Sequence, residues 1–143
     1  MTATDTSAMR PLLFADDQQF WYETLRALGH TAYGGADIGE VVTTAQRISG
    51  GLYDSWYEQW AATAQRVEAE ARAQLAAGHR VSGRDGLLRA ATYWRSAEFF
   101  TRTNEPDPRG RAAYEAGVAC FAGAAALMSP AVTPVTIPFE GTP

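Results

Sequence analysis

The sequence has 143 residues, of which 46% are hydrophobic, 11% aromatic and 20% charged, and its net charge is -4. This length suits one domain with a sizeable core, and the composition excludes intrinsic disorder, a collagen-like repeat and a disulfide scaffold. The slight acidity and the absence of a long apolar run argue against nucleic-acid and membrane partners, so we expect a soluble, cytoplasmic protein.

Helix-favouring residues, capping residues and glycines predict five helices. Asp16 caps the first helix, and Asp37 opens the second with Glu40 three residues later, as in a capping box. Ser82 caps the fourth helix, and Pro108 suits the first turn of the fifth. The predicted helices cover about 16–29, 37–50, 54–77, 82–101 and 108–128. The fold class is therefore an all-α, single bundle of about five helices.

The two longest predicted helices differ in the distribution of their apolar residues. The helix over 54–77 has one apolar stripe, formed by Trp56, Trp60, Ala64, Val67, Ala71 and Leu75. The helix over 82–101 is apolar in nearly every direction around its axis. A helix of that kind is usually central, so we expect the other helices to pack around it.

The segment from Ser129 to Pro143 has a different pattern. It contains four prolines, and its apolar residues alternate with threonine or proline. Proline keeps such a segment out of helices and central strands, which predicts an extended tail that leaves the helical body. Residues 1–13 are predicted to be disordered.

Most catalytic constellations are missing from the sequence. No serine lies in a G-x-S-x-G motif, and all basic residues are arginine, so lysine chemistry is excluded. Cys120 is the only cysteine, and the two histidines, His30 and His79, each follow a predicted helix-ending glycine. We expect no metal and no cofactor, and no complete hydrolase site.

Three groups of side chains remain as candidates for a site, each with a purely structural alternative. The aromatic run 20–23 forms either a pocket wall or core plus an ion pair between Glu23 and Arg26. The loop 33–37 forms either a ligand contact or a plain capped turn. Glu98 is either a buried functional carboxylate or an ion-pair partner of Arg95 or Arg102. The candidate acids and bases are Glu23, Asp37, Tyr93 and Glu98. The candidate substrate-binding residues are Trp21, Tyr22, Tyr33, Gly34, Gly35, Trp56, Tyr93 and Trp94.

Several ordered motifs resemble one family over nearly the whole chain from about Phe14. The motifs are FWYET at 20–24, YGGADIGE at 33–40, YDSW at 53–56, LRAATYWRSAEFF at 88–100, DPR at 107–109 and IPFEGT at 137–142. They resemble the N-terminal helical lid of the FrsA-like α/β-hydrolases, a group that includes 2,6-dihydroxypseudooxynicotine hydrolase and fungal hydrolases that shorten polyketide pigment precursors.

The resemblance implies a helical lid-like domain over 14–128, placed ahead of a catalytic α/β-hydrolase domain that this sequence does not contain. In the family the lid closes over the catalytic serine, supplies pocket walls, and serves hydrolysis of a carbon–carbon bond beside a carbonyl. The family's triad has no counterpart here. Leu52 replaces an acidic residue that is common in the family, and Phe139 replaces a tyrosine.

Three hypotheses for function stay open. The first is a lid that shapes a pocket for an aromatic or polyketide-like small molecule, is inactive as a hydrolase alone, and binds a separate α/β-hydrolase domain through its tail. The second is a stand-alone small-molecule binding protein, or a cyclase or isomerase of secondary metabolism, derived from such a lid. The third is a structural module that self-associates. An enclosed pocket lined by Trp21, Tyr33 and Tyr93 would favour the second.

Overall fold

The computed structural model describes residues 13–102 and 107–141, and its helices follow the capping signals of the sequence. Their bounds are α1 Gln18–Gly29, the 3-10 turn η1 His30–Tyr33, α2 Ile38–Ala45, α3 Tyr53–Ala76, α4 Arg80–Glu98, the 3-10 turn η2 Phe99–Thr101 and α5 Pro108–Ala125. The described residues contain no β-strand, which confirms the all-α prediction.

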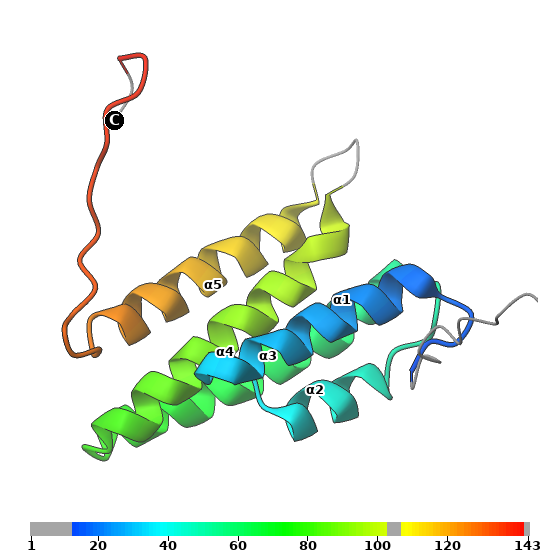
Figure 1. The fold of residues 1–143 in the computed structure, drawn as a ribbon, viewed down its shortest axis with the longest axis horizontal. Helices are drawn as coiled ribbons and strands as arrows, with labels where there is room; N and C mark the ends of the chain where they lie inside the picture. The colour runs from blue at the N-terminus through cyan, green and yellow to red at the C-terminus, as the bar shows by residue number, and fades with distance from the viewer. Residues whose placement is uncertain (1–12, 103–106, 142–143) are drawn as a thin grey trace, which may run out of the picture.

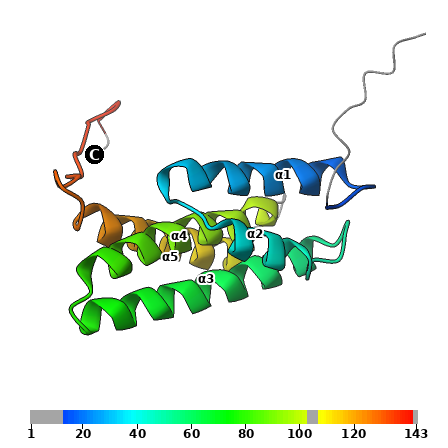
Figure 2. The same cartoon turned by 60° about the horizontal axis from the view of Figure 1, so that its bottom comes forward.

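Helix α4 lies in the middle of the bundle. It packs along α3 and α5 over most of its length and also contacts α1. Figures 1 and 2 show α1 and α2 on one side of the α3–α4 pair, with α5 alongside α4. The prediction that the helix apolar all round is central is therefore confirmed.

Aromatic side chains fill one end of the core, where α1 meets α3 and η2. The Phe20 ring lies 4.8 Å from Trp56 and 5.1 Å from Phe100, centroid to centroid. Further along α3, Trp60 packs on Tyr93 of α4 at 5.6 Å. Farther along the α3–α4 pair, small residues form the contact between the two helices. A Cβ on Gly86 would lie 2.7 Å from the Cβ of Ala71. Glycine thus sets how closely α3 and α4 approach.

Several predicted helix ends are wrong by a few residues. Asp17, not Asp16, caps α1, because its carboxylate accepts the Phe20 N–H at 3.0 Å. Helix α2 stops at Ala45 rather than near Gly50, and a turn beyond it buries Ile48.

The ends of α4 and α5 also differ from prediction. Gly78 has a φ of 82°, which reverses the chain within three residues, so α4 begins at Arg80 and Ser82 lies inside the helix. The helix ends at Glu98 and tightens into η2. Helix α5 ends at Ala125 rather than Met128; the Ala125 carbonyl accepts the Val132 N–H at 3.3 Å.

Beyond α5 the chain runs as an extended, exposed segment away from the bundle (Figure 1). Val135 is 79% exposed and Ile137 is 76% exposed. The predicted disordered segment 1–13 lies outside the described residues except for Leu13, and the last two residues of the tail also lie outside them. The division into three segments stays a prediction.

Candidate functional site

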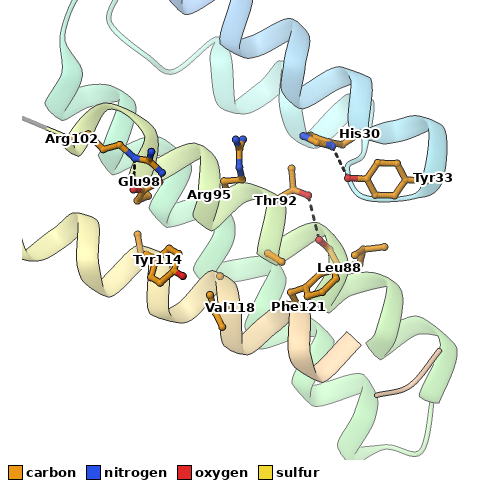
Figure 3. A pocket seen from close by; sticks show the side chains of 13 residues that line it. His30, Tyr33, Leu88, Thr92, Arg95, Glu98, Arg102, Tyr114, Val118 and Phe121 are labelled. Atoms are coloured by element: carbon orange, nitrogen blue, oxygen red, sulfur yellow. Dashed lines mark hydrogen bonds and ion pairs between the residues drawn. The ribbon is translucent and has the colours of Figure 1, made fainter. Parts of the chain in front are cut away.

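A groove of about 370 Å³ lies between α4 and α5, with η1 at its rim. Figure 3 shows its side chains, which come from all three elements. Most of its lining is apolar, and its volume is in the range of small-molecule sites. The groove is the best candidate for a ligand-binding site in the part of the chain that the structure describes.

Helix α4 forms the floor of the groove. Leu88, Thr92 and Arg95 follow one another at helical spacing and therefore share one face. The Thr92 hydroxyl donates to the Leu88 carbonyl at a long 3.5 Å. The floor thus changes from an aliphatic end at Leu88 to a cationic end at Arg95.

Helix α5 forms one wall with three large apolar side chains that solvent can reach. Tyr114, Val118 and Phe121 lie at positions i, i+4 and i+7 and are 60%, 51% and 49% exposed. Gly117 lies between them, where an added Cβ would sit 3.3 Å from the Cβ of Trp94. This glycine lets α5 pack close to α4. The apolar side chains of α5 therefore line the same groove as the floor residues of α4.

The opposite rim is η1, which follows α1 directly. The Tyr33 hydroxyl and His30 Nδ1 are 2.6 Å apart, and this pair lies at the α1 side of the groove in Figure 3. Burial, then the positive charges of Arg95 and Arg26, lower the pKa of His30 below its ordinary value. His30 is therefore a neutral imidazole at neutral pH, and one of its ring nitrogens is already engaged by Tyr33.

The carboxylate of Glu98 lies at one end of the groove and is fully paired. Arg102 donates to both of its oxygens, at 2.8 and 3.1 Å. Of the two arginines that the sequence offers as partners, the structure selects Arg102 over Arg95. Glu98 thus contributes little net charge to the groove.

Tyr93, another candidate acid or base, lies in the core on a different face of α4. Its hydroxyl donates to Glu40 Oε2 at 2.6 Å and accepts the Asp37 N–H at 2.9 Å. Glu40 also accepts from Arg89 at 3.0 Å. The predicted capping box of α2 is therefore modified: Asp37 accepts the Glu40 N–H, but Tyr93 stands between the Asp37 N–H and the Glu40 carboxylate.

The remaining candidate residues divide between the core and the outer surface. Trp56 and Trp94 are buried, and their indole N–H groups donate to the Ser96 carbonyl at 2.7 Å and to Glu68 at 2.8 Å. Trp21 and Tyr22 line a separate shallow depression on α1. Glu23 is buried and paired with Arg26 at 3.0 Å.

The structure brings only two of the predicted site residues, Tyr33 and Glu98, into the groove. In the glycine pair after Tyr33, Gly34 adopts a φ of 79° and so makes the turn, and Gly35 lies under the Tyr33 ring. Sequence reasoning missed the wall of α5. Its signal was available in the spacing of Tyr114, Val118 and Phe121, which repeats the helical period.

Among the described residues that line the groove there is no serine or cysteine, and the histidine there, His30, is engaged by Tyr33. No group of three or more His, Cys, Asp or Glu side chains among the described residues could hold a metal ion. None of the described helices is long and apolar enough to cross a membrane. What the groove can supply chemically is an apolar surface, hydroxyl groups, a neutral imidazole, the paired Glu98 and Arg102, and the side chain of Arg95.

Curated fungal hydrolases are similar to most of this chain. The 20-hydroxy-prefusarin hydrolase FUS2 of Gibberella moniliformis is 38% identical over 128 residues, which are 90% of this chain and 30% of that protein. The hydrolase ORFZ of Pyricularia oryzae is 39% identical over 131 residues, with coverage of 90% and 31%. The α/β hydrolase xenA of Xenoacremonium sinensis is 34% identical over 127 residues, with coverage of 89% and 29%.

The chain spans about 30% of the length of these relatives. No protein-family model matches the chain, and no solved structure matches it. The sequence of this helical bundle is therefore similar to one part of several fungal hydrolases, among them a protein named as an α/β hydrolase.

Proposed function

We propose that this chain is a lid-like helical domain of an α/β-hydrolase and that the α4–α5 groove forms one wall of its ligand pocket. The observation that carries the proposal is the apolar face of α5, where Tyr114, Val118 and Phe121 remain half exposed beside a groove of about 370 Å³. Exposed apolar surfaces of this kind mark binding sites for ligands or partners. The similarity to fungal hydrolases supports the same interpretation.

The side chains of the groove support binding rather than hydrolysis. A hydrolase nucleophile needs a hydroxyl or thiol next to a base. The Thr92 hydroxyl instead turns back to its own helix, and His30 is held by Tyr33. The groove residues therefore orient the ligand and exclude water, while the nucleophile comes from a separate catalytic domain.

The extended segment after α5 is the proposed link to that catalytic domain. Val135 and Ile137 are largely exposed, although valine and isoleucine are usually buried. Extended chain with alternating apolar residues suits addition to the edge of a sheet. This segment is therefore proposed to contact the sheet of the hydrolase domain.

The ligand is proposed to be an aromatic or polyketide-like molecule. FUS2, one of the relatives, is named for hydrolysis of 20-hydroxy-prefusarin. In this chain, the tyrosine and phenylalanine of α5 and Tyr33 at the rim offer aromatic faces on both sides of the groove.

Titration of the chain with 1-phenyl-1,3-butanedione, followed by NMR, tests this function. We expect saturable shifts at groove residues and no release of acetate or benzoate, because no described residue of the groove supplies a hydroxyl or thiol next to an available base. Val118→Asn should weaken binding about fivefold through loss of roughly 1 kcal/mol of apolar contact. The matched control is Val81→Asn, since Val81 is also an exposed helical valine but lies outside the groove.

Other outcomes would support the other hypotheses. Turnover of the dione by the chain alone would contradict the lid and favour an independent enzyme. Binding that Val118→Asn and Val81→Asn weaken equally would contradict the groove. A stable homo-oligomer in native mass spectrometry, with α5 protected from hydrogen exchange, would favour the self-associating module.

A further inference from the structure

Arg95 lines the apolar groove, is itself exposed, and carries a positive charge that no described carboxylate pairs with. Most arginines that the structure describes form ion pairs, as Arg89 does with Glu40 and Arg102 with Glu98. The side chain of Arg95 forms neither an ion pair nor a hydrogen bond with any described residue. In Figure 3 its side chain rises from α4 into the space between α4 and η1.

None of the neighbouring groups neutralises this charge. Glu98, the carboxylate in the groove, has both oxygens bound by Arg102. His30 carries no negative charge in either protonation state, and the field of Arg95 helps to lower its pKa, after burial. The groove as a whole therefore has an excess positive charge.

We propose that Arg95 binds a carboxylate of the ligand and that the apolar body of the ligand extends from there toward Leu88 and Phe121. The proposal rests on the proposed function of the groove and adds the chemical class of its ligand: an amphipathic monocarboxylate. Arginine is suited to this role, because its planar guanidinium binds a carboxylate through two parallel hydrogen bonds.

The geometry sets the size of the ligand. Arg95 and Leu88 are seven residues apart on one helix face, which corresponds to about 10 Å along the axis. Leu88, Val118 and Phe121 line the apolar end of this path. A carboxylate that is separated from a phenyl ring by about three methylene groups matches this length.

The test compares two probes of nearly equal shape, 4-phenylbutanoate and its neutral amide, 4-phenylbutanamide. Their dissociation constants are measured by NMR titration with the whole chain at pH 7.5. We expect the carboxylate to bind about fivefold more tightly, a difference of about 1 kcal/mol, as for an exposed ion pair. Arg95→Gln should remove this preference and leave the affinity for the amide within twofold.

Arg80→Gln is the matched control. The side chain of Arg80 also forms no ion pair or hydrogen bond with a described residue, and Arg80 is exposed and lies in α4 outside the groove. Its loss changes the net charge equally, so the preference for the carboxylate should persist. Since neither arginine is buried and neither side chain is bonded to a described residue, both variants should keep the helical circular dichroism of the wild type.

The outcomes separate this inference from the proposed function. Equal affinity of the two probes for the wild type, or a carboxylate preference that survives Arg95→Gln, would overturn the role of Arg95 and leave the apolar groove intact. The titrations extend to a probe concentration of about 10 mM, which detects dissociation constants in the millimolar range. If neither probe binds at the groove at that concentration, the proposed function fails as well.

Discussion

The buried hydroxyl of Tyr93 offers a sensitive test of how the loop before α2 is fixed to the core. Tyr93→Phe removes the donor to Glu40 and the acceptor for the Asp37 N–H while keeping the ring in place. A hydrogen bond to a charged group contributes about 1.5–3 kcal/mol, and a buried unpaired donor costs about 1–3 kcal/mol. Because Asp37 itself is exposed, water can reach part of this site. The expected loss in the free energy of unfolding is therefore about 2–3 kcal/mol.

Urea-induced unfolding, followed by far-ultraviolet circular dichroism, measures this loss. Tyr53→Phe is the matched control: Tyr53 is 53% exposed, and its hydroxyl makes no hydrogen bond with a described residue. We expect that control to change stability by less than about 0.5 kcal/mol. If the two variants lose equal stability, the hydroxyl of Tyr93 does not fix the loop, and the modified capping box is not a stabilising element.

Two further predictions concern α4. Gly86→Ala should destabilise the protein by about 1–3 kcal/mol, because the new Cβ would lie 2.7 Å from the Cβ of Ala71. Thermal unfolding of both variants measures this loss. Gly29→Ala is the control: its added Cβ meets nothing within 4 Å, so it should be neutral or slightly stabilising. Equal losses of stability in the two variants would contradict the close α3–α4 approach. Burial and the hydrogen bond to Glu40 raise the pKa of Tyr93. Its contribution to stability is thus complete below about pH 10, the ordinary tyrosine value, and is lost as the pH rises further. Urea titrations between about pH 9 and pH 11 should therefore show a shallower decline for Tyr93→Phe than for the wild type, and parallel declines would contradict this linkage.

The similarity to fungal hydrolases and the structure answer different parts of the functional question. The relatives indicate which class of protein contains such a segment, and the chain spans about 30% of their length. The structure shows which face of the bundle is left apolar and where its unpaired charge lies. The proposed ligand class comes from the second kind of evidence.

The sequence by itself determined the helices. Their signals are local: Asp37 caps α2, Gly78 ends α3 with a positive φ, and Pro108 opens α5, each through bonds or backbone angles within a few residues. The apolar distribution also predicted that α4 is central, because the positions of apolar residues around a helix axis indicate how many of its faces are buried.

Tertiary structure decided which side chains form the site. Tyr93 and Arg95 are two residues apart on α4, yet one hydroxyl is buried against Glu40 and the other side chain stands free in a groove. No local signal separates them, because the difference depends on which helix packs over each face. The side chain of Tyr93 is covered by α2 and α3, whereas the face of Arg95 looks toward α5 and η1, which do not close over it. Packing between distant segments thus made one apolar helix both part of the core and the floor of a groove.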